Sequence, residues 1–363
     1  MGLSGRQFSK TLAGAGISGA EYGEASPTPT TPSSVRNRTK IGSNAVFVGV
    51  DIGGTKTAIV LCSELPVILS RVEFPTLPNK GPDRALDLIK KTIYLSLDKP
   101  GLRISSLAAI GVSCGGPLDR LSGTIQSPPN LSTWIDIPIR SILEQEFGAE
   151  CRIENDANAG AVAEHRFGAG RGARNMVFLT MGTGLGAGTI INNALYRGAT
   201  EMAGEIGHVR LTRSGPVGYH KAGSVEGWAS GGGISAVAAR AVAAAARNRE
   251  HTSLSAVLQR KQSLTARDVS EAAKRGDVTA NRILRTAGEK LGEALAILVD
   301  ILNPERIVIG GLAVRLGDLL LNPARETLRR EALVPSATAC EIVPAALGEQ
   351  IGDFAALCVA KGL

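Results

Sequence analysis

The middle of the chain reads Ile153-Glu154-Asn155-Asp156-Ala157-Asn158-Ala159-Gly160-Ala161, where a polar segment turns directly into an alanine-rich one that runs to Phe167. Alanine favours helix, so the sequence predicts a helix from this point to Phe167. A carboxylate at a helix start faces the positive end of the helix dipole and tends to stay ionised. An ionised carboxylate within reach of a hydroxyl serves as a general base. The alternative is that Asn155 or Asp156 only caps the helix, which is the usual role of these residues there.

Two glycine-rich turns flank this segment, and each follows an apolar, strand-like run. The first turn is Asp51-Ile52-Gly53-Gly54-Thr55-Lys56, after Ala45–Val50, and the second is Met181-Gly182-Thr183-Gly184-Leu185-Gly186-Ala187-Gly188, after Met176–Thr180. Glycine lets backbone N–H groups approach a phosphate closely, and Lys or Thr adds charge and hydrogen bonds. An ordinary hairpin turn is the other interpretation. The repetition predicts a duplicated architecture with two phosphate-binding loops that face one another.

Further segments are predicted from hydrophobic spacing and turn signals. The strand Ile307–Ile309 ends at Gly310-Gly311, a third place where another group can approach the backbone closely. Thr265 and Asp268 have the spacing of a capping box, which predicts the start of a helix. Apolar residues at helical spacing predict helices over 82–98, 231–247, 279–302 and 353–360.

Composition indicates a globular protein that is larger than one ordinary domain. The 363 residues favour two lobes, and 44% hydrophobic with 20% charged residues is typical of a protein with an extensive core. No apolar run reaches the length needed to span a bilayer, so we expect no membrane partner. The five cysteines include no C-x-x-C pair, which favours reduced thiols in a cytoplasmic protein. The net charge of +7 forms no basic block, so no nucleic-acid partner is predicted.

Residues 1–44 are rich in Ser, Thr, Gly and Pro, with Pro27-Thr28-Pro29-Thr30-Thr31-Pro32 at the centre. Such a segment buries too little apolar surface to order itself, so we expect a disordered extension. A targeting peptide and a start codon placed too early are the alternatives that the sequence leaves open.

These segments together resemble the ROK family of sugar kinases, over residues 45–363. The family has the actin-like (ribonuclease H-like) ATPase fold that hexokinase and Hsp70 share. The resemblance implies an α/β fold with two lobes, duplicated sheets and a central cleft. It implies a small N-terminal lobe of residues 45–155 plus 349–363 and a large C-terminal lobe of residues 156–348. The ordered motifs that carry it are Asp51-Ile52-Gly53-Gly54-Thr55-Lys56, Glu154-Asn155-Asp156-Ala157-Asn158-Ala159, Met181-Gly182-Thr183-Gly184 and Gly204-Glu205-Ile206-Gly207-His208.

The resemblance also assigns roles to individual residues. It places the catalytic base on Asp156, and a carboxylate suits that role because a free sugar hydroxyl is a poor nucleophile at neutral pH. The implied sugar ligands are Asn130, Asn155, Glu205, His208 and Glu226. The implied nucleotide-binding residues are Asp51, Gly53, Gly54, Thr55, Lys56, Gly182, Thr183, Gly184, Gly310 and Gly311. The implied cofactors are ATP and Mg²⁺, since phosphoryl transfer depends on positioning and on neutralising phosphate charge.

The chain departs from the family where a structural zinc is usually held. The family segment after the His reads Cys-Gly-Cys-Gly-x-x-Gly-Cys-x-Glu, and the three cysteine positions here are Val217, Tyr219 and Ser224. A four-coordinate site does not survive the loss of three thiolates, so we expect no structural zinc and no protein-bound metal. His208 and His220 then hydrogen-bond sugar or backbone instead.

The leading hypothesis is an ATP-dependent kinase that transfers the γ-phosphoryl group to the 6-hydroxyl of a hexose, with glucose as the default. An amino-sugar kinase, of the kanosamine or N-acetylhexosamine type, is the alternative substrate class. An alternative of another class is a ROK-type sugar-sensing repressor without a DNA-binding domain, because residues 1–44 are too short and too rich in Pro, Ser and Thr for a winged helix-turn-helix. We expect a cytoplasmic homodimer, while the sugar, ATP or polyphosphate as donor, and dimer or tetramer stay open.

Overall fold

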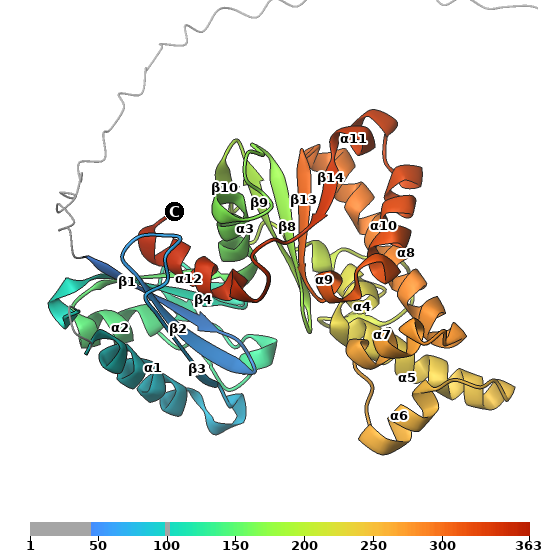
Figure 1. Ribbon diagram of the computed structural model, residues 1–363, viewed down its shortest axis with the longest axis horizontal. Helices are drawn as coiled ribbons and strands as arrows, with labels where there is room; N and C mark the ends of the chain where they lie inside the picture. The colour runs from blue at the N-terminus through green and yellow to red at the C-terminus, as the bar shows by residue number, and fades with distance from the viewer. Residues whose placement is uncertain (1–44, 99–101) are drawn as a thin grey trace, which may run out of the picture. The chain divides into compact units, whose positions relative to one another are not determined.

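Two five-stranded sheets with the same strand order organise the chain (Figure 1). The computed structural model describes residues 45–98 and 102–363, so the predicted disordered extension over 1–44 lies outside the described residues. The first sheet has the order β3-β2-β1-β4-β7 and the second β10-β9-β8-β13-β14. The strands of the first are β1 (Val46–Ile52), β2 (Lys56–Cys62), β3 (Ser70–Pro75), β4 (Leu107–Cys114) and β7 (Glu150–Asn155). Those of the second are β8 (Met176–Met181), β9 (Leu185–Ile191), β10 (Ala194–Tyr196), β13 (Arg306–Gly311) and β14 (Glu341–Pro344).

Strand direction repeats as well as strand order. In the first sheet β1, β2 and β3 are antiparallel, while β1, β4 and β7 run parallel. In the second sheet β8, β9 and β10 are antiparallel, while β8, β13 and β14 run parallel. The two glycine-rich turns predicted from the sequence therefore occupy equivalent places, β1–β2 and β8–β9. This repetition confirms the predicted duplication of an α/β unit.

Helices cover both faces of the first sheet. Val48 and Val50 belong to a cluster with α1 (Pro82–Leu97) and α2 (Ile139–Phe147) on one face. The alternate residue Phe47 packs on the other face with α12 (Ile351–Lys361). Close approach of α12 requires glycine in the strands, since a Cβ on Gly111 would lie 2.1 Å from the backbone nitrogen of Ala360. Strand β1 is thus buried on both faces, which explains the absence of polar side chains from Val46 to Val50.

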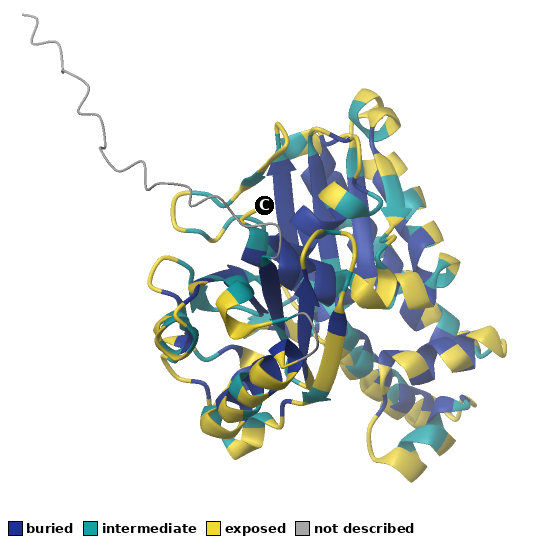
Figure 2. Cartoon of the chain, turned by 60° about the vertical axis from the view of Figure 1, so that its left-hand side comes forward, coloured by how far each residue is buried: buried dark blue, intermediate teal, exposed yellow. Residues whose placement is uncertain are grey.

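The second sheet is also covered on both faces, and Figure 2 shows its strands as largely buried. One face packs against helices between residues 225 and 339, with α8 (Val278–Leu302) and α10 (Asp318–Glu331) in mutual contact. The opposite face packs against α3 (Asp156–Phe167). The remaining helices are α4 (Val225–Ala229), α5 (Gly231–Asn248), α6 (Leu254–Lys261), α7 (Ala266–Lys274), α9 (Leu312–Leu316) and α11 (Val334–Ala339). None of the helices in the described ranges is both long and apolar enough to cross a membrane.

Helices α3 and α12 contact each other and lie between the two sheets in the packing. The rings of Phe167 in α3 and Phe354 in α12 lie 5.6 Å apart, and both helices contribute to one apolar cluster with the second sheet. Helix α12 also packs on β1 and β4 of the first sheet. Because α3 begins where β7 ends, its first residues stand at the edge where the first sheet's parallel strands terminate. The lobe boundaries at 155/156 and 348/349 stay a prediction.

Candidate active site

Asn155 and Asp156 stand at the junction of β7 and α3. Asn155 has extended backbone angles and is the N-cap of α3, with its Oδ1 accepting hydrogen bonds from the backbone nitrogens of Ala157 at 2.9 Å and Asn158 at 3.3 Å. Asp156 is the first residue of the helix, and its Oδ1 accepts from the Ala157 nitrogen at 2.8 Å. The capping role is therefore carried by Asn155, which leaves the second oxygen of Asp156 available for chemistry.

The environment of Asp156 suits a proton acceptor. The residue is exposed to solvent, yet desolvation by surrounding protein atoms raises the pKa of its carboxyl group above the ordinary 3.8. Backbone N–H groups of Ala157 and of Asp156 itself oppose this effect. Asp156 is thus accessible to water and also surrounded by many protein atoms. We infer that it lies in a concave part of the surface. A raised pKa also brings the group closer to the operating range of a general base.

The segment after β4 lies against these two residues. A Cβ on Gly116 would lie 3.3 Å from Nδ2 of Asn155, and one on Gly115 would lie 3.8 Å from Oδ2 of Asp156. A side chain at Gly116 would therefore crowd the amide of Asn155, while one at Gly115 would make an ordinary contact with the Asp156 carboxylate. The site prediction omitted this segment, although Gly-Gly-Pro directly after a buried strand is a signal that could have found it.

Asp51 is the charged residue near the end of β1, and it lies on the face that α12 covers. Burial raises the pKa of Asp51 to about 7, and the carboxylates of Asp156 and Asp353 act in the same direction. A Cβ on Gly352 would lie 2.1 Å from Oδ2 of Asp51, so only glycine fits there. Asp353 itself accepts a hydrogen bond from Nε of Arg71 at 2.8 Å. The start of α12 thus belongs to the site, a contribution that the sequence prediction missed.

The first glycine-rich turn closes through its own backbone. The Gly53 nitrogen donates to the Lys56 carbonyl at 2.9 Å, and the Thr55 carbonyl accepts from the Thr76 nitrogen at 3.1 Å. The ammonium of Lys56 lies 2.9 Å from Oε2 of Glu73 on the neighbouring strand. The predicted nucleotide-binding lysine is therefore held in an ion pair at the rim of the turn, and it is half exposed.

The first turn meets a predicted sugar ligand. Asn130 lies in a 3-10 helix over Pro129–Leu131. A Cβ on Gly54 would lie 2.6 Å from Cβ of Asn130 and 3.0 Å from its carbonyl oxygen. The predicted nucleotide-binding and sugar-binding segments are thus in contact at this point.

The three predicted sugar ligands of the second half share one electrostatic environment. Desolvation raises the pKa of Glu205, His208 opposes this effect, and the carboxylates of Glu226 and Asp156 add to it. Glu205 and His208 are both exposed, while Oε2 of Glu226 accepts from the Leu185 nitrogen at 3.0 Å. These influences place Glu205, His208 and Glu226 around the same site as Asp156.

The second glycine-rich turn is held by the start of the helix predicted over 231–247, a contact that the site prediction did not include. The Gly231 nitrogen donates to the Gly182 carbonyl at 2.9 Å, and the Gly232 nitrogen donates to the Thr183 carbonyl at 3.0 Å. Both donors belong to the first turn of α5. A Cβ on Gly184 would lie 2.7 Å from Oε2 of Glu226, so the turn also touches a predicted sugar ligand.

The third predicted turn lies beside the second. Gly310 and Gly311 end β13 and pair with Thr180 and Met181 of β8. Gly311 has a φ of +66°, and a Cβ there would lie 2.2 Å from the Met181 carbonyl oxygen, so the position requires glycine. Gly310-Gly311 and the turn that begins at Gly182 therefore lie side by side at the same end of strands β13 and β8.

Hydrogen bonds hold the segment 217–224, which was predicted to lack a zinc site. The Lys221 ammonium donates to the His208 carbonyl at 2.9 Å, and the Ser224 hydroxyl caps α4 by accepting from the Gly227 nitrogen at 3.1 Å. The rings of His208 and Tyr219 meet edge to face at 6.2 Å. Within residues 45–98 and 102–363, no cluster of three or more His, Cys, Asp or Glu side chains is arranged to hold a metal ion. The absence of zinc stays a prediction.

Comparison with known proteins places this arrangement in a family. The sequence model described as "ROK family" matches residues 47–362. The chain belongs to the ROK family. This ROK protein is 35% identical over 316 residues to a glucokinase of Halalkalibacterium halodurans, covering 85% of this chain and 93% of the relative. It is 31% identical over 289 residues to a xylose repressor of Caldicellulosiruptor bescii, covering 79% of this chain and 71% of the repressor.

A solved structure extends the similarity to three dimensions. The ROK family glucokinase of Streptomyces griseus, solved in complex with glucose and AMPPNP, is 32% identical and superposes with a TM-score of 0.72. The match covers 88% of this ROK protein and 100% of that chain. The predicted actin-like fold with two lobes is thereby confirmed.

Proposed function

We propose that this ROK protein is an ATP-dependent sugar kinase that transfers the γ-phosphoryl group to the 6-hydroxyl of a hexose, with glucose as the default substrate. The observation that carries the proposal is the environment of Asp156, a solvent-exposed carboxylate whose pKa is raised by desolvation. The glycine-rich turns lie against two of the proposed sugar ligands, with Gly54 beside Asn130 and Gly184 beside Glu226. The glucokinase relatives support the same reaction.

The sugar-binding side of the site consists of donors and acceptors suited to hydroxyl groups. Asn155 keeps its Nδ2 free of the capping bonds, because only its Oδ1 accepts them. Glu205 and His208 present exposed side chains, and Asn130 is also exposed. Several directional hydrogen bonds of this kind discriminate between sugars by leaving polar groups unpaired when the wrong hydroxyl is present.

The nucleotide-binding side combines the three glycine-rich turns. In the turns at Gly53-Gly54 and at Gly182-Thr183-Gly184 the backbone is exposed or partly exposed. The Gly53 and Gly182 nitrogens donate within their own turns, so we assign the approach to phosphates to the N–H groups that follow them. Gly310-Gly311 stands beside the second turn through the pairing of β13 with β8. We assign the phosphates to the first two turns and the nucleoside to the third.

The residues around Asp51 fit the Mg²⁺ ion that accompanies ATP. Burial and two neighbouring carboxylates raise its pKa to about 7, and a cation at this place would relieve their repulsion. One or two carboxylates together with substrate phosphates are a usual set of ligands for Mg²⁺. When bound, the ion neutralises charge on the phosphates that the reaction transfers.

The chain's own residues then divide the work of the reaction. Glu205, His208 and Asn155 hold the sugar so that its reacting hydroxyl faces Asp156. The second oxygen of Asp156 accepts the hydroxyl proton as the new phosphorus–oxygen bond forms. The hydrogen bond from the Ala157 nitrogen to Oδ1 fixes the direction of the carboxylate. Positioning and a placed proton acceptor are the main contributions that a protein makes to this chemistry.

A sugar-responsive repressor is the second candidate, supported by the similarity to a xylose repressor. An amino-sugar kinase is the alternative among enzymes. The test is release of ADP from ATP and Mg²⁺ with a panel of glucose, mannose, xylose, kanosamine and N-acetylated hexosamines, with product phosphorylation followed by mass spectrometry. Phosphorylation of glucose supports the proposal, while phosphorylation of an amino sugar alone supports the alternative. Sugar binding without any phosphorylation would overturn the kinase proposal.

The assembly and location are further proposals. We propose a cytoplasmic homodimer that takes sugar and ATP and has no nucleic-acid or membrane partner. The relatives of this family support the choice of small-molecule partners. Light scattering of the purified protein would distinguish a dimer from a monomer or a tetramer.

A further inference from the structure

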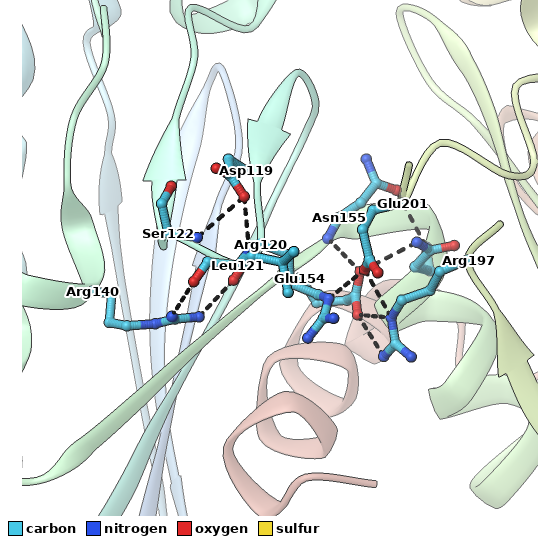
Figure 3. A network of polar contacts seen from close by, with 10 residues as sticks. Asp119, Arg120, Leu121, Ser122, Arg140, Glu154, Asn155, Arg197 and Glu201 are labelled. Carbon is cyan, nitrogen blue, oxygen red and sulfur yellow. Dashed lines mark hydrogen bonds and ion pairs between the residues drawn. The ribbon is translucent and has the colours of Figure 1, made fainter. Parts of the chain in front are cut away.

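Four side chains of alternating charge form a chain of ion pairs next to the Asn155–Asp156 segment (Figure 3). We call this chain of ion pairs the line. Its members are Glu154, Arg197, Glu201 and Arg120, in that order. Nε and Nη2 of Arg197 donate to Oε2 of Glu154 at 2.9 and 2.8 Å. Nε of Arg197 also lies 3.7 Å from Oε2 of Glu201, which accepts a hydrogen bond from Nε of Arg120.

The two outer ion pairs join parts of the chain that belong to different sheets. Glu154 lies in β7 of the first sheet, and Arg120 lies between β5 (Leu118–Asp119) and β6 (Thr124–Ile125). Arg197 and Glu201 follow β10, the edge strand of the second sheet. The hydrogen bond from Arg120 lowers the pKa of Glu201, as expected for a pair that forms in the folded protein.

One end of the line fixes the backbone of the catalytic segment. While Oε2 of Glu154 binds Arg197, its Oε1 accepts from the Asn155 nitrogen at 3.1 Å and from Nδ2 of Asn158 at 3.2 Å. The Glu154 side chain is only 8% exposed, so its carboxylate depends on these partners instead of water. The orientation of Glu154 is thus coupled to the residue that precedes Asp156 and to the first turn of α3.

Arg197, in the middle of the line, also holds the loop that precedes the proposed sugar ligand Glu205. The Ala203 nitrogen donates to the Arg197 carbonyl at 2.9 Å, which closes the loop 197–203. Gly204 follows with a φ of +96°, and a Cβ there would lie 2.2 Å from the Ala187 carbonyl oxygen. Glu205 comes next. Arg197 therefore holds the loop that presents Glu205 through its backbone and holds Glu154 through its side chain.

We propose that Arg197 is a positioning residue for the kinase reaction, which aligns the Asn155–Asp156 segment of one sheet with the Glu205 loop of the other. The inference rests on the proposed function, because alignment matters only if one sugar contacts both segments. Losing the guanidinium separates the sugar ligands from the proton acceptor. Misplacement of reacting groups by about 1 Å lowers rates by roughly 100-fold.

A cavity beside the ion pair offers space in which water can replace the guanidinium. A cavity of about 210 Å³ is lined by Glu154, Arg197 and Arg120. Such a space accommodates several water molecules, which would solvate the Glu154 carboxylate once its partner is removed. Arg197→Gln therefore tests the alignment of the Asn155–Asp156 segment with the Glu205 loop more than it tests folding.

The experiment measures kcat and KM for glucose and for ATP in Arg197→Gln, Arg197→Lys and the control Arg306→Gln. Arg306 likewise donates from Nε and Nη2 to one carboxylate oxygen, Oε2 of Glu341, and its side chain is 27% exposed against 31% for Arg197. Its partner differs, because the Glu341 side chain is 65% exposed and that of Glu154 is 8% exposed, so this variant controls for the loss of a surface guanidinium. We expect Arg197→Gln to lower kcat/KM for glucose about 10- to 100-fold, with KM for ATP within about twofold of wild type. Arg197→Lys restores part of the loss, because an ammonium keeps the charge without the paired N–H groups. The control keeps wild-type kinetics.

The outcomes separate this inference from the proposed function. A wild-type protein that phosphorylates no sugar refutes the function, and calorimetric binding of glucose then tests the alignment alone, with weaker binding expected for Arg197→Gln. An active wild type with unchanged kinetics in a folded Arg197→Gln variant overturns the inference. If that variant does not fold, Glu201→Gln and Arg120→Gln are measured in its place. Each of them weakens the ion pair between Arg120 and Glu201 and leaves the bond between Arg197 and Glu154 in place. A raised KM for glucose in both supports the proposal, and an unchanged KM overturns it.

Discussion

Replacing Asp156 by Asn removes its proposed role as a base and keeps its structural contacts at the start of α3. The hydrogen bonds that cap the helix come from Asn155, so the substitution leaves them in place. The amide oxygen of Asn also replaces Oδ1 in the 2.8 Å bond from the Ala157 nitrogen. Asp156 raises the pKa of both Asp51 and Glu205, which means that its charge repels theirs. Stability should therefore stay within about 0.5 kcal/mol of wild type, or rise slightly.

Catalysis should respond quite differently. The amide has no basic oxygen with which to take the hydroxyl proton, and a positioned general base contributes about 10²- to 10⁴-fold to the rate. The barrier for transfer then rises by about 3–5 kcal/mol. We expect kcat of Asp156→Asn to fall at least 100-fold, while glucose affinity changes far less because an amide still hydrogen-bonds a hydroxyl.

The assay is steady-state release of ADP, combined with thermal unfolding and calorimetric binding of glucose. Glu205→Gln is the matched control, since it also exchanges a carboxylate for an amide in the same electrostatic environment. As a sugar ligand, Glu205 should mainly raise KM when it is replaced. An Asp156→Asn protein that unfolds like wild type and keeps near-normal turnover would refute the assignment of the base.

Three further predictions follow from particular contacts. Gly54→Ala should raise KM for the sugar several-fold, because the new Cβ would lie 2.6 Å from Asn130; normal steady-state kinetics would contradict this contact. Burial would raise the pKa of Asp268, but Lys261 and Thr265 outweigh it and lower the pKa from 3.8 to about 2. The stability that Asp268 adds, up to roughly 2 kcal/mol, should be present above pH 4 and decline as the pH falls towards 2; urea unfolding of wild type and Asp268→Asn at several pH values checks this, and a difference independent of pH would count against it. Elemental analysis should find no stoichiometric zinc, because the three thiolate positions hold other residues, and one zinc per chain would overturn that expectation.

Local sequence signals predicted much of the fold. The glycine-rich turns between apolar strands gave the correct duplication, since glycine and β-branched residues specify turns and strands through backbone sterics. The capping box of Thr265 and Asp268 is present as predicted. Helix α10 was not predicted, and Pro323 stands inside it. Gly288 of α8 packs against that proline, a compensation between distant segments that no local pattern reveals.

The site was predictable where one segment supplies the chemistry and less so where several segments meet. The motif around Asp156 identified the proposed base, and its charge acts on two other predicted site residues, Asp51 and Glu205. The roles of these residues stay a prediction. Contributions from the start of α12 beside Asp51 and from the start of α5 beside the second turn were missed. These depend on packing between residues about 300 and about 50 positions apart, and single-segment reasoning contains no information about such distances.

The late position of α12 in the chain has a consequence for synthesis on the ribosome. All strands of the first sheet have emerged by Asn155, but the helix that covers one of its faces begins only at Ile351. At about 5–20 residues per second, the apolar surface around Phe47 waits roughly 10–40 seconds for its cover. The nascent chain therefore carries a sheet with one uncovered face through more than half of translation. A chaperone has time to bind to this face.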